Sequence, residues 1–399
     1  MKVLCIALLW PNENNRNSAT QIVQQIASRT ECGADITLIA PYSAGKGKTV
    51  WLDEYQPMPT KFLPIPYPAL PYVWRLSPNF FLLSAKLLEY SILRYVRKLG
   101  GFEQFDVVHI HELGGSITLA KSIKKRARVP VIVTVHGQHP ALSKYQNDPG
   151  FIRKTVSYSQ WFDKVFLVGK PLESFVKKFG FKSGDISVLH NGHQRPDEDP
   201  KQVEKFRSEY SGKTLISSVA RLYPLKGTDI TLKALANLYQ QGLVDWHYLH
   251  VGEGPEKPEL EKLAADYGIQ ANVTFLGHLP YSEAMTVVAA SDLFVMPSWL
   301  EAFGIVYVEA MARGKPVIGC WDSGAEESVR HEVDGFLAKR KNVDDVESAL
   351  RKLITDSELR KVMGANGLRR AAEFTWEQNS RRYIKVYEEL LESNLQPKT

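Results

Sequence analysis

The sequence of 399 residues has few cysteines and no long hydrophobic run. Its three cysteines, Cys5, Cys32 and Cys320, are far apart and form no CxxC pair, which argues against a disulfide framework or a zinc knuckle and favours reduced thiols. No run of about 18 apolar residues occurs, so we expect no membrane-spanning helix. The apolar start, residues 3–10, follows one lysine and precedes no convincing cleavage site, so we interpret it as a buried strand rather than a signal peptide.

The composition is that of a globular protein with an uneven charge. Apolar residues make up 44% and charged residues 24%, which excludes a disordered, collagen-like or coiled-coil chain. At about 150 residues per domain, the length predicts two or three domains. Residues 1–200 hold 25 basic and 16 acidic residues, a net charge of +9, whereas the remainder holds 25 and 28, a net −3. We therefore expect the first half to face an anionic partner, although not a nucleic acid.

Short runs rich in Val, Ile and Leu alternate with stretches of helical length along the whole chain. Such runs are typical of parallel sheets that are covered by helices on both faces. Two sets of them predict an α/β protein with two doubly wound domains. The runs are 3–9, 36–40, 107–111, 131–136, 165–168 and 186–189, followed by 215–220, 248–251, 273–276, 293–296 and 317–319.

The polar, proline-flanked segment 194–200 is the best candidate for a linker. We therefore expect one Rossmann-like domain at 1–193 and a second at 201–375. Residues 376–399 are expected to form a helix that crosses back to the first domain. In open parallel sheets, ligands bind outside the carboxyl ends of the strands. Two such domains would thus enclose a cleft.

Residues 296–318 carry the strongest chemical signal. We expect a strand to end near Met296, and a helix to begin near Gly304 and stop at Gly314. The free N–H groups at that helix start can bind a phosphate or a sugar oxygen. Glu301 and Glu309, at different depths, can each hold a different diol of one elongated ligand. The two glutamates alone would be a weak signal, but the whole segment is far more specific.

A second segment, residues 218–229, offers two cations. Arg221 ends a strand, and Lys226 with Gly227 opens the helix expected from Thr228 to about Gln240. A forked guanidinium and an ammonium beside a helix N-terminus suit a diphosphate. Taken alone, the same residues could instead form a surface salt bridge.

Together, these segments resemble the retaining glycosyltransferases of the GT-B fold, in the large family that shares E-x7-E and is usually called family 4. The resemblance covers nearly the whole chain. It implies two Rossmann-like domains that face each other across a cleft, the first on the acceptor side and the second binding a sugar nucleotide. The matching motifs are 106–111, 134–137 (T-x-H-G), 190–192, 221 with 226–227, 252–255, 301–309, 314–316 and 324–327.

The resemblance also implies roles for single residues. Arg221 and Lys226 would neutralise the departing diphosphate, and Glu309 would hold the ribose hydroxyls. Glu301 would bind the donor sugar, and His136 would lie beside it near the reacting carbon. Front-face attack with retention is implied, without metal or cofactor, moving a hexose or N-acetylhexosamine from a UDP- or GDP-sugar to a hydroxyl acceptor in polysaccharide or glycolipid assembly. The other donor-binding residues implied are Asn17, Ser18, Gly252, Phe303 and Gly304.

The sequence departs from the family pattern at three places. The first loop, residues 10–18, lacks the glycines that usually meet the diphosphate there. Either Arg16, Asn17 or Ser18 replaces their contacts, or acceptor binding differs. Ala302 replaces a common glycine, and 169–170 stands where a serine often follows the fifth strand. None of these changes removes a residue that the chemistry requires.

Other interpretations remain open. His109 and His111 could imitate a metal site, but no carboxylate cluster accompanies them, so we interpret them as structural. Residues 197–199, Asp-Glu-Asp, imitate a metal-binding D-x-D motif, but between prolines we expect them to be solvated. The alternatives to a transferase are a sugar-nucleotide epimerase, hydrolase or phosphorylase of the same fold, and a metal-dependent hydrolase.

The basic half contains one candidate surface. On a helix, Lys121, Lys124, Lys125 and Arg128 would form a single stripe. The stripe is either a solvated face or a surface for reversible docking on an anionic membrane, where each basic residue contributes about 1 kcal/mol. The reduced thiols favour a cytoplasmic protein, which under the second interpretation is peripheral on the inner face of the membrane and close to a lipid-linked acceptor.

Overall fold

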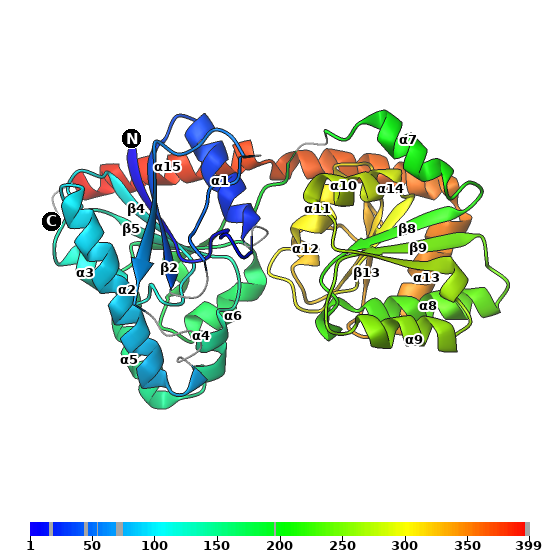
Figure 1. The fold of residues 1–399 in the computed structure, drawn as a ribbon, viewed down its shortest axis with the longest axis horizontal. Coiled ribbons are helices and arrows are strands. Elements are labelled where there is room, and N and C mark those ends of the chain that lie inside the picture. Colours follow the sequence, from blue (N-terminus) through cyan, green and yellow to red (C-terminus); the bar gives the residue numbers. More distant parts are fainter. Residues whose placement is uncertain (16–18, 44–46, 54, 69–74, 195–196, 396–399) are drawn as a thin grey trace. The chain divides into compact units, whose positions relative to one another are not determined.

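The computed structural model describes residues 1–399 except 16–18, 44–46, 54, 69–74, 195–196 and 396–399 (Figure 1). The chain divides into two compact units. Unit 1 consists of Met1–Gly192 and Trp376–Thr399, and unit 2 of His193–Thr375. In the described residues each unit contains one sheet, with every strand pairing parallel. The predicted α/β class with two doubly wound parallel sheets is therefore confirmed.

The sheet of unit 1 has the order β3-β2-β1-β4-β5-β6-β7. From β1 the chain leads outward to one edge, and from β4 it leads to the other, so the topological switch point lies between these two strands. Residues 3–7 of β1 are all buried, as expected for a central strand with helices on both faces. The strands are β1 (Lys2–Ala7), β2 (Asp35–Ser43), β3 (Lys61–Tyr67), β4 (Val107–His111), β5 (Val131–Val135), β6 (Lys164–Leu167) and β7 (Ile186–Val188).

The helices of unit 1 come from both ends of the sequence. Helix α1 packs beside α15, and Tyr383 and Tyr387 of α15 are fully buried in the same core as β1 and β2. Helix α2 begins at an N-cap, Ser77, whose hydroxyl accepts from the Phe80 N–H at 3.4 Å. The helices are α1 (Thr20–Glu31), α2 (Pro78–Lys98), α3 (Leu119–Lys124), α4 (Pro140–Tyr145), α5 (Pro149–Ser159), α6 (Glu173–Lys177) and α15 (Trp376–Leu395), with the 3₁₀ turns η2 (Lys170–Leu172) and η3 (Ser183–Asp185).

Unit 2 is built in the same way, with the order β10-β9-β8-β11-β12-β13 and a switch point between β8 and β11. The strands are β8 (Thr214–Val219), β9 (Trp246–Val251), β10 (Val273–Gly277), β11 (Leu293–Val295), β12 (Val317–Cys320) and β13 (Gly335–Ala338). The helices are α7 (Pro200–Ser208), α8 (Thr228–Gln240), α9 (Lys257–Asp266), α10 (Tyr281–Ala290), α11 (Ile305–Met311), α12 (Ala325–Ser328), α13 (Val343–Thr355) and α14 (Ser357–Ala371), with the turns η4 (Pro224–Lys226), η5 (Gln270–Asn272) and η6 (Ala372–Phe374).

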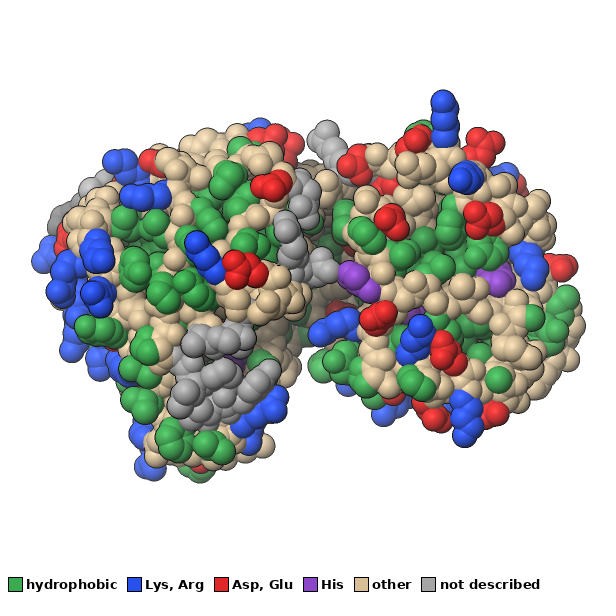
Figure 2. All heavy atoms as spheres, viewed as in Figure 1, with side chains coloured by type: hydrophobic (Ala, Val, Ile, Leu, Met, Phe, Trp, Pro, Cys, Tyr) green, Lys and Arg blue, Asp and Glu red, His purple; other side chains and the backbone are tan. Residues whose placement is uncertain are grey.

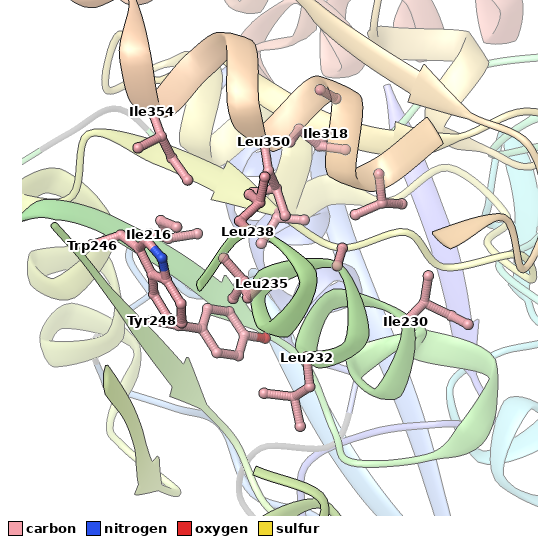
Figure 3. Close-up of a cluster of buried hydrophobic side chains, with 14 of the residues drawn as sticks. Ile216, Ile230, Leu232, Leu235, Leu238, Trp246, Tyr248, Ile318, Leu350 and Ile354 are labelled. Atoms are coloured by element: carbon pink, nitrogen blue, oxygen red, sulfur yellow. The ribbon is translucent and has the colours of Figure 1, made fainter. Parts of the chain in front are cut away.

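The core of unit 2 centres on α8. Leu235 and Leu238 of this helix are buried beside Trp246 and Tyr248 of β9, and Leu350 of α13 belongs to the same cluster (Figure 3). Fully burying a side chain of this size contributes about 1.5–3 kcal/mol. This packing fixes the start of α8, and with it the segment that joins β8 to α8.

The predicted basic stripe is wrong as a helical feature. Helix α3 ends at Lys124, because the chain turns there to bury Ala127 and Val129 and to enter Pro130. Lys124 pairs with Asp163 at 2.6 Å, and the Lys121 ammonium lies over the rings of Tyr158 and Trp161, 5.7 and 5.9 Å from the centroids. Only Lys125 and Arg128 of the four are exposed, although basic side chains do gather over α3 (Figure 2).

None of the described helices is long and apolar enough to span a bilayer.

Candidate functional site

Two segments meet at the switch point of unit 2. The turn η4 follows β8, and residues 296–301 follow β11, so both leave the carboxyl ends of neighbouring strands. The Trp299 N–H donates to the Leu225 carbonyl at 3.1 Å, and the Ser298 hydroxyl lies 3.0 Å from that same oxygen. The two segments predicted from the sequence are thus held against each other by their backbones.

An ion pair lies at this junction. The Lys226 ammonium contacts Oε1 of Glu301, and the Ser298 hydroxyl lies 3.0 Å from the same oxygen. Both charged side chains are largely buried, at 19% and 14% exposure. Glu301 is therefore held in one orientation, and Lys226 places a positive charge beside it at the sheet edge.

Glycine is required where these segments approach most closely. Gly227 has φ +72°, and a Cβ there would lie 2.7 Å from the Pro297 carbonyl oxygen. Gly252, after β9, has φ +133°, and a Cβ there would clash with the carbonyl oxygen of Ala220. No L-residue with a side chain adopts these conformations easily. The close backbone approach after β8, β9 and β11 therefore depends on these two glycines.

Glu309 lies deeper, on α11. The residue is 8% exposed, and its carboxyl accepts a hydrogen bond from the Tyr281 hydroxyl at 2.8 Å. Burial raises the pKa of Glu309, whereas the Tyr281 hydrogen bond and the Arg313 charge oppose that shift. Tyr281 fixes one carboxylate oxygen, so the other can accept from a hydroxyl group of a ligand.

Arg313 stabilises α11 through a backbone hydrogen bond and an ion pair. Its guanidinium donates to the Glu309 backbone carbonyl at 2.8 Å and forms an ion pair with Glu198. The two side chains of this pair are 2% and 6% exposed. The expectation that residues 197–199 are solvated is thus wrong for Glu198. Its side chain is buried because it supplies the counter-charge that the buried Arg313 guanidinium needs. Sequence reasoning also missed Tyr281.

The remaining sequence-predicted residues of this region lie nearby in the fold but make different contacts. Arg221 is exposed, with its guanidinium 5.2 Å from the Tyr223 ring centroid. Phe303 is buried and packs on Phe374, and Gly304 caps α11 in the left-handed conformation. Helix α11 ends at Met311 rather than Gly314, because the chain turns after Ala312.

In unit 1, His136 follows β5 and meets the last residue of β4. Its Nε2 lies 3.1 Å from Nδ1 of His111, and the two rings are stacked. Burial lowers the pKa of His136 to about 3 and holds that of His111 well below its usual range. Both rings are therefore neutral at pH 7. A neutral imidazole can exchange hydrogen bonds with a sugar hydroxyl without bringing a charge to it.

His109 belongs to a buried network and not to an open metal site. Its Nδ1 lies 2.6 Å from Nη1 of Arg29 and 2.6 Å from the Tyr387 hydroxyl, and its Nε2 lies 2.8 Å from the Thr134 hydroxyl. Among the residues that the structure describes, one group of possible ligands, Cys5 with His109 and His111, could hold an ion. Both nitrogens of His109 are already used, and burial raises the pKa of the Cys5 thiol to about 11. This arrangement disfavours a metal.

Glu112 is a residue that the sequence analysis missed. It follows β4 directly, is 3% exposed and has φ +80°. Its carboxyl accepts from the N–H of Leu113 at 3.3 Å and from the N–H of His136, and burial raises its pKa to about 8. The sequence signal that could have identified Glu112 is a polar residue that directly follows a predicted strand. A buried carboxyl with a perturbed pKa beside His136 is a candidate functional group.

Asn17 and Ser18 lie outside the described residues. The described part of the first loop is an ordered turn, in which Asn12 Oδ1 accepts from the N–H groups of Asn14 and Asn15 at 3.0 Å. Trp10 ties the loop to the neighbouring segment by donating from Nε1 to the Val50 carbonyl at 2.8 Å. Side-chain amides therefore stand in this loop where glycines were expected.

Two family models match the chain. The model "Glycosyl transferases group 1" matches residues 200–370, and "Glycosyltransferase Family 4" matches residues 26–194. Among curated proteins, the chain is 27% identical to an uncharacterized glycosyltransferase of Methanocaldococcus jannaschii, over 72% of this chain and 76% of that protein. It is 28% identical to the D-inositol 3-phosphate glycosyltransferase of Nocardia farcinica, over 73% of this chain and 67% of that one.

Solved structures share the fold. The sucrose-phosphate synthase of Thermosynechococcus elongatus superposes with a TM-score of 0.75 at 18% identity, over 98% of this chain and all of that one. HepE of Anabaena, solved in complex with UDP, gives a TM-score of 0.74 at 20% identity with the same coverage. These likenesses extend over both units of the chain.

Proposed function

Because this chain belongs to the glycosyltransferases of the GT-B fold, with the family 4 and group 1 models matched in succession along it, we propose that it moves a hexose or N-acetylhexosamine from a UDP- or GDP-sugar to a hydroxyl acceptor with retention. The reaction serves polysaccharide or glycolipid assembly, and the acceptor is free or lipid-linked. HepE, a neighbour by fold, was solved with UDP-glucose, which supports a nucleotide-sugar donor.

The observation that carries this proposal is the Lys226–Glu301 pair at the switch point, with Glu309 deeper on α11. In this assignment Lys226 and Arg221 meet the diphosphate, and Glu301 meets the donor sugar. Glu309 binds the ribose diol through the carboxylate oxygen that Tyr281 does not hold. The backbone at Phe303 and Gly304 and the tight turn at Gly252 complete the donor site.

The leaving group needs positive charge, which this site supplies through side chains. Charge placed in advance beside a departing phosphate stabilises the transition state without reorganisation. With His136 beside the donor sugar and the departing phosphate taking the acceptor's proton, the reaction requires no metal and no cofactor. Activity should therefore persist in EDTA, whereas complete inhibition that Mg²⁺ or Mn²⁺ reverses would contradict this part of the proposal.

The two glutamates give the sharpest test. Glu309→Gln should weaken binding of the nucleoside diphosphate in isothermal titration, because the ribose contact is shared by donor and product. Glu301→Gln should leave that binding unchanged and lower turnover, because its partner is the sugar. Equal weakening by both changes would contradict the assignment. Release of free sugar from the donor without an acceptor product would favour a hydrolase or epimerase instead.

We also propose that unit 1 docks reversibly on an anionic membrane. The outer face of α2 exposes Leu83 and Tyr90 at 56% and 64%, and Arg94 and Arg97 follow on the same face at helical spacing. Apolar side chains that lead into basic ones suit an interface with acidic lipids. The exposed Lys125 and the neighbouring Arg128 add to the positive charge of this unit.

Vesicle co-sedimentation tests this docking. Wild type should bind vesicles that contain anionic lipid better than neutral ones, and less so at high salt. Arg94→Glu with Arg97→Glu should abolish the difference, whereas Lys201→Glu with Lys205→Glu on α7 of unit 2 should preserve it. Equal binding of the wild type to both kinds of vesicle would refute the docking.

A further inference from the structure

Two histidine rings at the carboxyl ends of β4 and β5 are joined to each other, and each has one nitrogen left over. Nδ1 of His111 and Nε2 of His136 lie 3.1 Å apart, whereas the ring centroids lie 5.4 Å apart, so these two nitrogens point toward each other. The outer nitrogens, Nε2 of His111 and Nδ1 of His136, are buried and have no hydrogen-bond partner among the described residues. The pair is thus satisfied at its inner nitrogens only.

The positions of the two ring protons are linked. Burial lowers the pKa of both histidines, so at pH 7 each ring is neutral and carries one proton. One inner nitrogen must donate and the other accept, which leaves two arrangements. If His111 donates from Nδ1, then His136 carries its own proton on the outer Nδ1. If His136 donates from Nε2, then His111 carries its proton on the outer Nε2.

Burial distinguishes these two arrangements. His111 is 0% exposed, whereas His136 is partly exposed at the edge of the sheet. An N–H on Nε2 of His111 would be cut off from every partner, and a buried donor without a partner is costly. Buried N–H groups of the backbone lack a partner more rarely than carbonyl oxygens do, and the same preference applies to these rings. The arrangement with both protons on Nδ1 is therefore favoured, because only His136 can acquire a partner from outside.

The main chain of His136 is held by the residue that follows His111. Glu112 has φ +80°, a left-handed conformation that residues with a side chain rarely adopt, and its carboxyl accepts from the backbone N–H of His136. The Glu112 N–H in turn donates to the Thr134 carbonyl at 2.8 Å, two residues before His136. Two consecutive residues at the end of β4 therefore fix the ring and the main chain of His136.

We propose that His111 and Glu112 are positioning residues that hold His136 as an Nδ1–H donor, and that this N–H donates to an oxygen of the donor sugar. The inference rests on the proposed function, which puts the donor sugar beside His136, and it names the atom that meets the sugar and the ring that sets its proton. With Nε2 engaged by His111 and Nδ1 protonated, His136 has no nitrogen left to act as a base. The acceptor's proton then goes to the departing phosphate.

The tautomers can be measured without substrate. Long-range proton–nitrogen correlation spectra of the histidine-labelled full chain distinguish a protonated from an unprotonated ring nitrogen, and His136→Gln and His111→Phe assign the signals. At pH 7 we expect His111 and His136 to be protonated on Nδ1. His109 is the internal control, because its Nδ1 faces the Arg29 guanidinium, which can only donate, so its proton belongs on Nε2. A proton on Nε2 of His136 in the wild type would overturn the proposal.

Variants separate control of the tautomer from packing. His111→Phe keeps a planar ring but offers no donor, so the proton of His136 should redistribute between Nδ1 and Nε2. His111→Asn keeps an N–H near the position of Nδ1 and should restore the wild-type tautomer. Glu112→Gln, at the adjacent position, leaves the ring contact intact and should also preserve it. A His136 tautomer that stays unchanged in His111→Phe would contradict the role given to His111.

Titration calorimetry connects the tautomer to the sugar. In His111→Phe the affinity for UDP-glucose should fall by the inverse of the fraction of His136 that keeps its proton on Nδ1, so a fraction of about one fifth would give about a fivefold loss. UDP, which has no sugar, should bind wild type and His111→Phe alike. Glu112→Ala should weaken UDP-glucose more than Glu112→Gln does, because the glutamine still accepts from the His136 N–H. GDP-mannose and GDP serve as the second pair of probes.

The outcomes are distinguishable. A loss of UDP-glucose affinity that does not follow the measured tautomer fraction, or an equal loss for UDP and UDP-glucose, would overturn the proposal. Failure of the wild type to bind any of the four nucleotides would instead overturn the proposed function, since the tautomers are measured in their absence.

Discussion

The buried carboxyl of Glu112 makes a quantitative prediction about the pH dependence of unit 1. In the native state its pKa is raised to about 8 by burial, whereas an unfolded glutamate titrates at about 4.3. Between these values the native state keeps a proton that the unfolded state has released. The free energy of unfolding must therefore decrease as the pH rises through this interval.

The size of the effect follows from the shift. Each unit of pKa difference corresponds to about 1.4 kcal/mol, so the whole interval corresponds to at most about 5 kcal/mol at pH 8 and above. Glu112→Gln removes this titration and keeps an oxygen that can accept from the N–H groups of Leu113 and His136. The free energy of unfolding of the variant, relative to that of wild type, should thus increase by up to about 1.4 kcal/mol per pH unit from about pH 4.5 to 8. Above that pH the difference should stay constant.

Urea unfolding read by hydrogen exchange of peptides from β4 and β5 would measure this difference in unit 1 separately from unit 2. Wild type and Glu112→Gln should be compared at each pH, so that all other titrating groups cancel. Parallel stability curves from pH 5 to 9 would refute the reasoning, because they would mean that the Glu112 carboxyl titrates alike in the native and unfolded states.

Three more predictions follow from the described contacts. Arg221→Ala or Lys226→Ala should each lower kcat/KM about tenfold to a hundredfold, from the loss of a charge-assisted hydrogen bond of about 1.5–3 kcal/mol; unaltered transfer kinetics in both would exclude the diphosphate assignment. Because the pKa of His136 is lowered to about 3, the contribution of His136 to the stability of unit 1 should be complete above the unfolded value of about 6.5 and be lost as the pH drops below it; a difference in stability between wild type and His136→Asn that stays constant in chemical denaturation from pH 6.5 to 4 would contradict this. Gly252→Ala should lose most nucleotide binding in titration calorimetry and unfold more easily by about 1–3 kcal/mol, because a Cβ there would clash with Ala220; wild-type affinity would show that the turn tolerates a side chain.

The sequence predicted the interior of both sheets but not two of their edges. Strand β3 was missed because Pro64 and Pro66 interrupt its apolar pattern, and proline is normally taken as evidence against a strand. It pairs only with β2, so each proline can turn its missing N–H to the unpaired side. The short β13, which begins with Gly335, is likewise an edge strand. Periodicity is informative where both faces are buried, and less so at an edge.

For the candidate site, the order of motifs placed Lys226 and Glu301 at the same edge of one sheet, and the structure brings them into contact. Partners far apart in sequence could not be foreseen. Arg313 and Glu198 are 115 positions apart, and nothing in the proline-flanked linker indicates that its middle carboxylate is buried. The order of the strands along the sequence predicts which residues lie at the carboxyl edge of a sheet. It does not predict which buried acidic and basic side chains pair, because that depends on how segments far apart in the sequence pack together.

The return of α15 to unit 1 has a consequence for the order in which the protein is made. Tyr387 of α15 hydrogen-bonds Arg29 of α1 and His109 of β4, which lie 358 and 278 positions earlier in the chain. The buried Arg29 guanidinium therefore lacks one of its hydrogen-bond partners until α15 has been synthesised. All of unit 2 is synthesised between them. Unit 2 can therefore fold during synthesis before the core of unit 1 is complete. The apolar faces of α1 and β1 stay exposed until α15 leaves the ribosome. Chaperones that act on this protein during translation would find their binding surface in the half that is made first and closed last.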